Sequence, residues 1–387
     1  MGRHDKTVHT IAFIIDGLGM GGAERLMMPI LDHLDKNRFN VRVCVLQSKD
    51  GNPLTKDILT LGVKVDLMGI RRLRDPSSLS RLQKYLKNEQ VNLVHTQLEF
   101  ANVLGNISAK LLHLPSVSTV HVLPPAGGSI KNKLHQWVEW LALRLFCDHV
   151  ITVSEETRRH YIAQSGIPSE KLSTIYNGID PDRFRRLEFG LERIAVREEF
   201  HIPLDANLLT TIAVLRPQKG IEYMIRALPT VLESHPNTYY LIAGDGSHRD
   251  ILAAETENLG VRDRVIFAGT RRDVPQLLAA SDVFVLPTLT EALPTVLAEA
   301  MASHVPIVAS AVGGVPEMVV NDKNGKLVSP AKPAELSDAC NTLLNSPEVR
   351  RSMGEFGWQV VNQKFNINNQ VNQLQNLYLE QIHRYGK

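Results

Sequence analysis

Short apolar runs alternate with longer segments of mixed polarity along most of the chain. In the first half, the apolar runs cover residues 8–16, 40–47, 91–97, 115–122 and 148–155. The segments between them have the apolar spacing of helices, as expected where helices cover a buried parallel sheet. A second series of apolar runs covers residues 207–215, 238–244, 263–269, 282–288 and 305–310. The pattern predicts an α/β chain with two doubly wound, Rossmann-like domains.

A polar, irregular stretch near residues 177–205 separates the two series. We therefore expect a first domain over residues 1–185 and a second over residues 200–364. Residues 366–387 have apolar positions at helical spacing, and we expect this last helix to cross back to the first domain. Two such domains would face each other across a cleft at the carboxyl ends of their strands, where open α/β sheets bind ligands.

Composition and charge narrow the possible functions. Hydrophobic residues make up 43% of the chain, which argues against global disorder, and no apolar run is long enough to span a bilayer. Cys44, Cys147 and Cys340 lack metal-ligand spacing, which indicates reduced thiols in a cytoplasmic protein. Residues 1–185 hold 24 Lys and Arg against 18 Asp and Glu, and the remainder holds 19 against 23. The basic half could attract an anionic partner or membrane surface, unless the asymmetry is ordinary surface scatter.

Two acids, eight positions apart, lie in the otherwise apolar stretch TLTEALPTVLAEAMA. Glu291 precedes Pro294, which suits the first turn of a helix, and Glu299 lies within that helix. The backbone N–H groups of Thr295 and Val296 would then be free to bind phosphate. The carboxylates could accept hydrogen bonds from ribose and sugar hydroxyls. Incidental acids at a helix start are the alternative.

Glycines and cations follow other predicted strands. Gly17, Gly19 and Gly22 match G-x-G-x-x-G, but Gln47 stands where dinucleotide-binding proteins have an acid. A nicotinamide or flavin cofactor is therefore not expected. Gly22 would still permit close approach of the backbone to a diphosphate, or serve only a tight turn.

The loop sequence AVLRPQKG places Arg216 and Lys219 after another predicted strand. Both could neutralise a diphosphate, or be ordinary solvated cations. His95 and His121 also end strands, a placement typical of functional residues, although a lone histidine more often has a structural role. No residues have zinc spacing and no phosphate-binding P-loop occurs. We interpret the DPD sequence near residue 180 as a domain exit rather than a metal site, and expect neither metal nor cofactor.

Taken together, these features resemble glycosyltransferase family 4, also called group 1, whose members are retaining nucleotide-sugar glycosyltransferases of GT-B architecture. The resemblance covers nearly the whole chain, and the order and spacing of its motifs make the set more specific than any one motif. The motifs are GGAER (21–25), VHTQ (94–97), TVH (119–121), VSE (153–155), NGID (177–180), LRPQKG (215–220), GDG (244–246), EALPTVLAE (291–299) and GGVPE (313–317).

The resemblance implies a role for each matching residue. Glu299 would hold the nucleotide ribose, Glu291 the hydroxyls of the donor sugar, and Lys219 the diphosphate. Gly22 would let the first loop approach donor and acceptor, and His121 would face the hydroxymethyl side of the donor sugar. Glu291, His121 and Lys219 form the expected catalytic set. The backbone N–H groups expected to meet phosphate and sugar are those near Leu293, Thr295 and Val296.

Two positions depart from the family pattern. Val214 stands where many members have a second diphosphate-binding residue, an arginine, and Arg216 is the candidate to replace it. Gln97 stands where a histidine is frequent. Because Gln97 differs from the family pattern on the acceptor side, the resemblance does not specify how the acceptor is bound.

The resemblance implies a metal-independent hexosyltransferase that uses a nucleotide sugar, UDP- rather than GDP-linked. Its acceptor would be a hydroxyl on a lipid-linked or polysaccharide precursor, with no nucleic acid involved, and it would act in the cytoplasm at the inner face of the membrane. A nucleotide-sugar epimerase of the same architecture and a non-catalytic nucleotide-sugar-binding subunit are the alternatives.

The segment SIKNKLHQWVEWLALRLF has two possible interpretations. Trp137 and Trp140 follow Lys131 and Lys133, a composition that could bind an anionic membrane. We favour instead a helix that packs against the core. Its core-facing side would consist of Leu134, Val138, Leu141 and Leu145.

Overall fold

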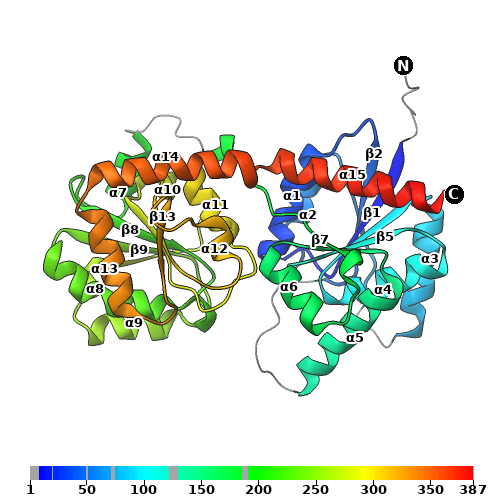
Figure 1. Ribbon diagram of the computed structural model, residues 1–387, viewed down its shortest axis with the longest axis horizontal. Coiled ribbons are helices and arrows are strands. Elements are labelled where there is room, and N and C mark those ends of the chain that lie inside the picture. Colours follow the sequence, from blue (N-terminus) through cyan, green and yellow to red (C-terminus); the bar gives the residue numbers. More distant parts are fainter. Residues whose placement is uncertain are drawn as a thin grey trace. The chain divides into compact units, whose positions relative to one another are not determined.

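The computed structural model describes residues 8–19, 21–48, 51–70, 75–121, 130–184 and 191–386. The chain divides into two compact units. Unit 1 consists of Met1–Asn177 and Ile367–Lys387, and unit 2 of Gly178–Asn366. Each unit has a parallel sheet with helices packed on it, so the predicted α/β architecture with two sheets is confirmed (Figure 1).

Unit 1 has a seven-stranded parallel sheet with the order β3-β2-β1-β4-β5-β6-β7. The strands are β1 (His9–Ile15), β2 (Phe39–Val45), β3 (Lys64–Leu67), β4 (Leu93–Gln97), β5 (Ser116–Val120), β6 (His149–Thr152) and β7 (Leu172–Thr174). The strand order reverses at β1, which pairs with β2 on one side and β4 on the other. Residues 11–15 are fully buried, as expected for a strand covered on both faces.

The helices of unit 1 begin at residues suited to helix starts. Asp75 accepts a hydrogen bond from the Ser77 N–H at 2.9 Å, and Ser154 accepts one from the Thr157 N–H at 3.1 Å. The helices are α1 (Gly22–His33), α2 (Thr55–Thr60), α3 (Pro76–Asn88), α4 (Glu99–Leu111), α5 (Ile130–Phe146), α6 (Glu155–Gln164), the 3-10 helix η1 (Ser169–Lys171) and α15 (Ile367–Tyr385).

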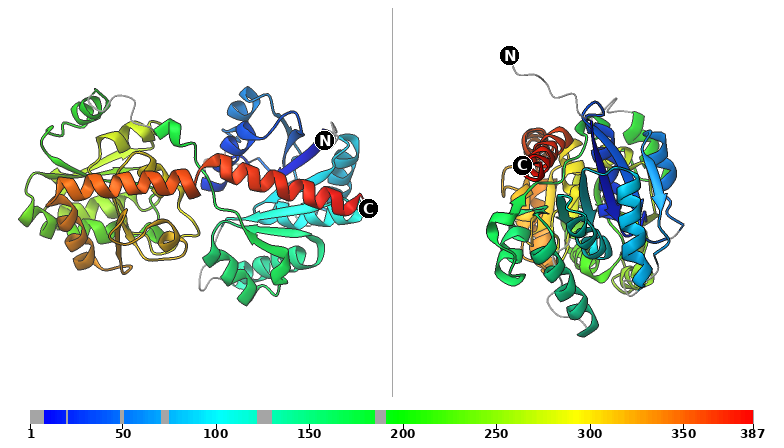
Figure 2. Two further views of the ribbon diagram at one scale, coloured as in Figure 1. Left: turned by 45° about the horizontal axis from the view of Figure 1, so that its top comes forward. Right: turned by 90° about the vertical axis from the view of Figure 1, so that its right-hand side faces the viewer.

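The last helix, α15, completes the core of unit 1, which confirms the predicted return of the chain (Figures 1 and 2). Val371, Leu374 and Tyr378 are buried in the same cluster as residues of β1 and α1. The Tyr378 hydroxyl lies 2.6 Å from His95 Nδ1, so a polar contact also joins α15 to β4.

Unit 2 has a six-stranded parallel sheet with the order β10-β9-β8-β11-β12-β13. The strands are β8 (Asn207–Ile212), β9 (Thr238–Ala243), β10 (Val265–Gly269), β11 (Val283–Leu286), β12 (Ile307–Ser310) and β13 (Gly325–Val328). The α-helices are α7 (Leu191–Glu199), α8 (Ile221–Ser234), α9 (Arg249–Asn258), α10 (Val274–Ala280), α11 (Thr295–Ala302), α12 (Val315–Met318), α13 (Pro333–Leu344) and α14 (Pro347–Lys364). The 3-10 helices are η2 (Pro181–Phe184), η3 (Pro217–Lys219) and η4 (Arg262–Arg264).

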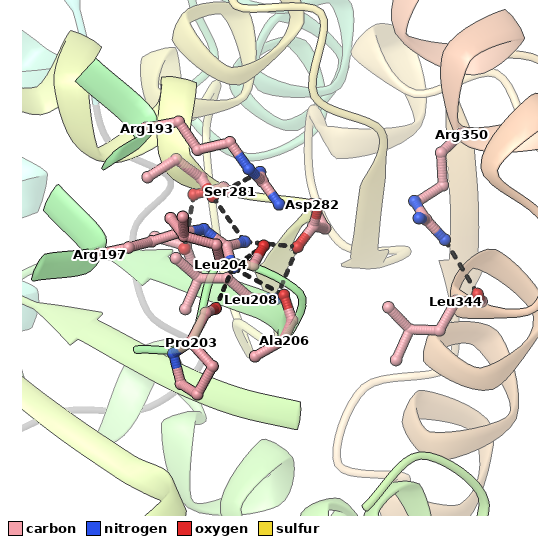
Figure 3. A network of polar contacts seen from close by, with 12 residues as sticks. Arg193, Arg197, Pro203, Leu204, Ala206, Leu208, Ser281, Asp282, Leu344 and Arg350 are labelled. Carbon is pink, nitrogen blue, oxygen red and sulfur yellow. Dashed lines mark hydrogen bonds and ion pairs between the residues drawn. The ribbon is translucent and has the colours of Figure 1, made fainter. Parts of the chain in front are cut away.

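The stretch near residues 177–205 was wrongly expected to be irregular, because it contains α7. Arg197 on this helix is fully buried and donates to the carbonyl oxygen of Ala206 at 2.7 Å and to Asp282 Oδ2 at 2.9 Å (Figure 3). Asp282 also accepts from the Leu208 N–H at 2.8 Å and from Arg193 at 3.2 Å. A buried arginine with these partners joins α7 to the starts of β8 and β11.

Residues 130–146 form a helix that packs on unit 1, as we favoured, but the predicted core-facing side was wrong. Leu134, Leu141 and Leu145, expected to face the core, are exposed on α5. The inward face of this helix instead carries Ala142 and Leu143, which are buried. Periodicity indicated an apolar side, but it could not show which side faces the protein.

Candidate functional site

Close backbone packing positions the loops at the carboxyl ends of the strands in unit 2. Gly220 has a φ of 60°, and a Cβ added there would lie 2.2 Å from the Pro287 carbonyl oxygen. A Cβ on Gly244 would lie 1.8 Å from the carbonyl oxygen of Ala213. Only glycine allows both approaches. The loop after β8 is therefore held directly against the loops after β9 and β11.

Lys219 and Glu291 meet at this edge of the sheet. Lys219 Nζ lies 2.5 Å from Glu291 Oε1, and both side chains are largely shielded from solvent. Thr288 Oγ1 lies 3.0 Å from the carbonyl oxygen of Gln218 and 3.3 Å from Glu291 Oε1, and the Leu289 N–H donates to the same carbonyl at 2.8 Å. Two sequence-predicted residues, 72 positions apart, are thus joined through a cross-linked pair of loops.

Helix α11 begins directly after the Glu291 loop, at Thr295, with Pro294 in the capping position. Pro294 provides no side-chain hydrogen bond to the helix start, so first-turn N–H groups can serve an anionic ligand. Thr295, Val296 and Glu299 are all partly exposed on this helix. Leu293 is buried and anchors the loop.

Arg216 ends up near the same edge, three residues before Lys219. Its side chain is exposed, and its guanidinium forms no hydrogen bond or ion pair in the part of the chain that the structure describes. Val214 is also exposed. Arg216 is therefore available to an incoming anion, whereas Lys219 already has a carboxylate partner.

The two remaining sequence-predicted site residues, Gly22 and His121, belong to unit 1. A Cβ on Gly22 would meet nothing within 4 Å, so the space beside this residue is open. A Cβ on Gly21 would lie 2.3 Å from Glu24 Oε2, because the carboxylate folds back over the start of α1. A side chain at position 21 would therefore require the Glu24 carboxylate to move, whereas one at position 22 would displace nothing.

His121 follows β5, and both of its ring nitrogens are buried without a hydrogen-bond partner among the described residues. Burial lowers the pKa of His121 to about 4, against an opposing effect of Glu24. The ring is consequently neutral near pH 7 and can exchange hydrogen bonds with a hydroxyl. Gln97, at the end of the adjacent strand β4, likewise has a buried Oε1 with no partner in the described residues.

His95 has a different environment from His121. Its Nδ1 lies 2.6 Å from the Tyr378 hydroxyl, and its Nε2 lies 2.7 Å from Thr119 Oγ1. Burial, with a smaller effect of His121, lowers the pKa of His95 to about 3. With both nitrogens satisfied inside the core, the contacts favour a structural role for this histidine.

Sequence reasoning missed Thr288 and Glu24 as residues that organise these loops. Thr288 lies three positions before Glu291 and is fully buried, and Glu24 lies in the first turn of α1 and is nearly so. A glutamate three residues after a helix cap was the available signal for Glu24. Nothing in the sequence marks Thr288, because its role depends on the carbonyl of a distant loop.

The arrangement of ligand-type side chains and the apolarity of the helices bear on metal binding and membrane spanning. No group of three or more His, Cys, Asp or Glu side chains is arranged to hold a metal ion. Within the DPD sequence, the Asp182 N–H donates to Asp180 Oδ1 at 3.1 Å, a contact within a turn. None of the described helices combines the length and apolarity needed to cross a bilayer.

Comparison with known proteins gives two family matches. Residues 20–183 match the family described as "Glycosyltransferase Family 4", and residues 192–360 match "Glycosyl transferases group 1". An uncharacterised glycosyltransferase of Methanocaldococcus jannaschii is 30% identical over 305 residues, which cover 77% of this chain and 78% of that protein.

One further relative and one solved structure match almost the whole chain. An Escherichia coli UDP-Gal:alpha-D-GlcNAc-diphosphoundecaprenol alpha-1,3-galactosyltransferase is 28% identical, covering 94% of this chain and 95% of that protein. The crystal structure of Anabaena HepE in complex with UDP superposes with a TM-score of 0.85 at 23% identity, covering 96% of this chain and 100% of HepE. At this level of identity, the likeness to HepE shows a shared fold only.

Proposed function

The chain belongs to glycosyltransferase family 4, or group 1, and on this premise we propose that it transfers a sugar from a UDP-sugar to a hydroxyl group with retention of anomeric configuration. The observation that carries the proposal is the Lys219–Glu291 pair beside the start of α11. It combines a cation and open N–H groups for a diphosphate with a fixed carboxylate for sugar hydroxyls.

Transfer breaks the bond between the anomeric carbon and a phosphate oxygen, which leaves positive charge on the sugar and negative charge on the diphosphate. In the proposed site, Lys219, Arg216 and the first turn of α11 stabilise the leaving diphosphate. An ammonium group has three donors, so Lys219 can keep its contact with Glu291 while it binds a phosphate oxygen. No metal ion is required in this scheme.

Glu291 acts in this proposal as a sugar-binding residue rather than a nucleophile. Its Oε1 accepts from Lys219 and lies near Thr288 Oγ1, which fixes the carboxylate and leaves Oε2 for donor hydroxyls. Glu299, further along α11, would accept hydrogen bonds from the ribose. Retention would follow if the acceptor attacks on the side of the departing diphosphate, with a phosphate oxygen taking the acceptor proton.

In unit 1, His121 would bind a donor-sugar hydroxyl, and Gly22 would give the α1 loop access to the substrates. The neutral ring of His121 suits this role, because it can donate and accept a hydrogen bond but would not compete for the diphosphate. The pairing that its ring nitrogens lack among the described residues would then come from substrate.

The choice of donor and acceptor draws on the relatives. The name of the Escherichia coli relative specifies UDP-Gal and a diphosphoundecaprenol-linked acceptor, and HepE was solved with UDP. We therefore propose a UDP-hexose donor and a lipid-linked glycan precursor as acceptor. The protein would act peripherally at the cytoplasmic face of the membrane.

The test is an assay of UDP- and GDP-sugars with diphosphopolyprenol-linked acceptors in the presence of EDTA. The proposal predicts a glycosylated lipid whose new linkage has the donor's anomeric configuration by NMR. An inverted product would contradict retention, and full inhibition by EDTA that added Mg²⁺ reverses would contradict metal independence. An epimerised donor without transfer, or donor binding without turnover over the acceptor panel, would contradict the transferase assignment itself.

A further inference from the structure

Helix α5 of unit 1 exposes a continuous apolar stripe. Leu134, Trp137, Leu141 and Leu145 are 55%, 57%, 36% and 52% exposed. Their spacing of three or four residues places them on one side of the helix. Single exposed apolar residues are common on protein surfaces, but an aligned set that includes a tryptophan indicates a binding surface.

The opposite side of α5 is anchored to the protein. Asn102 on α4 donates a hydrogen bond to Glu139 Oε1 at 2.7 Å, and Leu143 is fully buried. The stripe therefore cannot rotate into the core without breaking these contacts. Its exposure is a consequence of how the helix is fixed.

The charges around the stripe have one sign. Lys131, Lys133 and Arg144 are exposed on α5, and Glu139, which faces inward, is the only acid in its sequence. Lys133 and Arg144 flank one edge of the stripe and Lys131 the other, as helical geometry requires of these positions. Cations beside an exposed apolar stripe with tryptophan match the chemistry of an anionic lipid surface.

The beginning of α5 is also accessible. In Figure 1 and the right-hand view of Figure 2, this end of the helix extends past the neighbouring helices of unit 1. A flat partner could therefore reach the stripe without displacing another element of the unit.

We propose that α5 docks unit 1 on an anionic bilayer, with Leu134, Trp137, Leu141 and Leu145 inserted among the lipids and the three cations at the headgroups. This inference names the surface for the peripheral membrane location in the proposed function and rests on it. A second protein is the alternative occupant. The sequence of α5 has no acid on the side of the stripe, and cations lie along both of its edges, which favours lipid.

The test uses the full-length protein with vesicles of phosphatidylcholine alone or mixed with phosphatidylglycerol. We expect co-sedimentation with the mixed vesicles that weakens as salt is added, and quenching of tryptophan fluorescence by brominated lipid. The Trp137→Ser/Leu141→Ser variant should bind at least about tenfold more weakly. Lys131→Gln and Lys133→Gln should each weaken binding to the mixed vesicles about fivefold at low salt. The matched control is Ile251→Ser, because Ile251 is 58% exposed on α9 of unit 2.

Transfer to a water-soluble acceptor analogue separates this proposal from the proposed function. The stripe variant should keep wild-type turnover on the soluble analogue and lose turnover on acceptor embedded in vesicles. Equal vesicle binding by wild type and the stripe variant would overturn the docking surface, as would a wild type that binds neither kind of vesicle. If the wild-type protein does not glycosylate the soluble analogue at all, the result would contradict the transferase proposal rather than the docking surface.

Discussion

The two units place polar side chains at the carboxyl ends of their strands in contrasting ways. In unit 2, Lys219 and Glu291 are paired with each other, and Thr288 supports the pair. In unit 1, Gln97 Oε1 and both ring nitrogens of His121 are buried and have no partner among the described residues. A buried polar atom without a partner lowers stability, and such atoms persist where a ligand can satisfy them. Under the proposed function, unit 2 would provide a preorganised site for a charged group, and unit 1 would provide hydrogen-bonding groups that a sugar completes.

The largest effect is expected where a satisfied charge in unit 2 loses its partner. Asp282→Ala would leave the guanidinium of Arg197 buried without its carboxylate, at a cost of about 3–5 kcal/mol in the free energy of unfolding. Urea unfolding in a Trp137→Phe/Trp140→Phe background would follow Trp358 of unit 2. Glu348→Ala, on the exposed start of α14, is the control. A loss below about 1 kcal/mol would show that this network contributes little.

Removal of Lys219 should affect catalysis more than stability. Lys219→Ala should lower kcat by roughly 10²- to 10³-fold, because the leaving diphosphate loses a preorganised cation. Glu291→Gln should raise KM for the donor and reduce kcat, since it weakens both the Lys219 contact and sugar binding. Steady-state kinetics and circular dichroism would separate the two effects. Near-normal turnover of Lys219→Ala, with the exposed Lys323→Ala as control, would reject the site assignment.

Acid should destabilise unit 1 through its buried histidines. The pKa values of His95 and His121 are lowered to about 3 and about 4, and the value for an unfolded chain is about 6.5. Between pH 6.5 and 4 the unfolded chain binds protons that the folded chain excludes. The free energy of unfolding should therefore fall with decreasing pH, by roughly 1.4 kcal/mol per pH unit for each histidine.

Glu139 acts in the opposite direction, because burial raises its pKa to about 7 and the folded chain keeps a proton that the unfolded chain releases. Comparison with a variant isolates the histidine contribution. His95→Gln should have a smaller loss of stability than wild type between pH 6.5 and 4.5. Identical pH dependence in the two proteins would contradict the assignment of His95 as a buried neutral group.

The smallest change in stability is expected at the unsatisfied positions of unit 1. Gln97→Met and His121→Leu are apolar replacements of similar size. They remove Gln97 Oε1 and the His121 ring nitrogens, which are buried without a partner among the described residues, so the melting temperature should stay the same or rise. Transfer should nevertheless fall, because the substrate loses a hydrogen-bond partner. Thr288→Val in unit 2 is the comparison, because it removes a hydroxyl that has partners. It should lower the free energy of unfolding by about 1 kcal/mol. A drop in melting temperature for both unit 1 variants would mean that these side chains have structural roles.

The sequence predicted much of this contrast for unit 2 and little of it for unit 1. The end of β11, the loop at Glu291 and the start of α11 after Pro294 follow from local patterns, and the structure has them where expected. The direct contact between Lys219 and Glu291 required a fold that brings two loops together. The short edge strands β3, β7 and β13 were missed because each has few apolar residues.

The two wrong predictions, for α7 and for the buried side of α5, have a common physical cause. The nine residues of α7 are rich in charge, and a buried arginine packs on the unit beside a single buried apolar residue, Val196. On α5, apolar residues lie on both sides, and only the packing of Leu143 and the Asn102–Glu139 hydrogen bond decides which side is exposed. The spacing of apolar residues indicates that a helix has an apolar face, but tertiary contacts determine whether that face is buried or exposed.

A crystal structure of the protein with bound UDP tests the central claim most directly. The account predicts the diphosphate within hydrogen-bonding distance of Lys219 Nζ and of the Thr295 or Val296 N–H, and the ribose hydroxyls on the carboxylate of Glu299. A well-ordered UDP bound away from α11, with the Lys219–Glu291 pair unchanged and Glu299 in contact with solvent only, would contradict it.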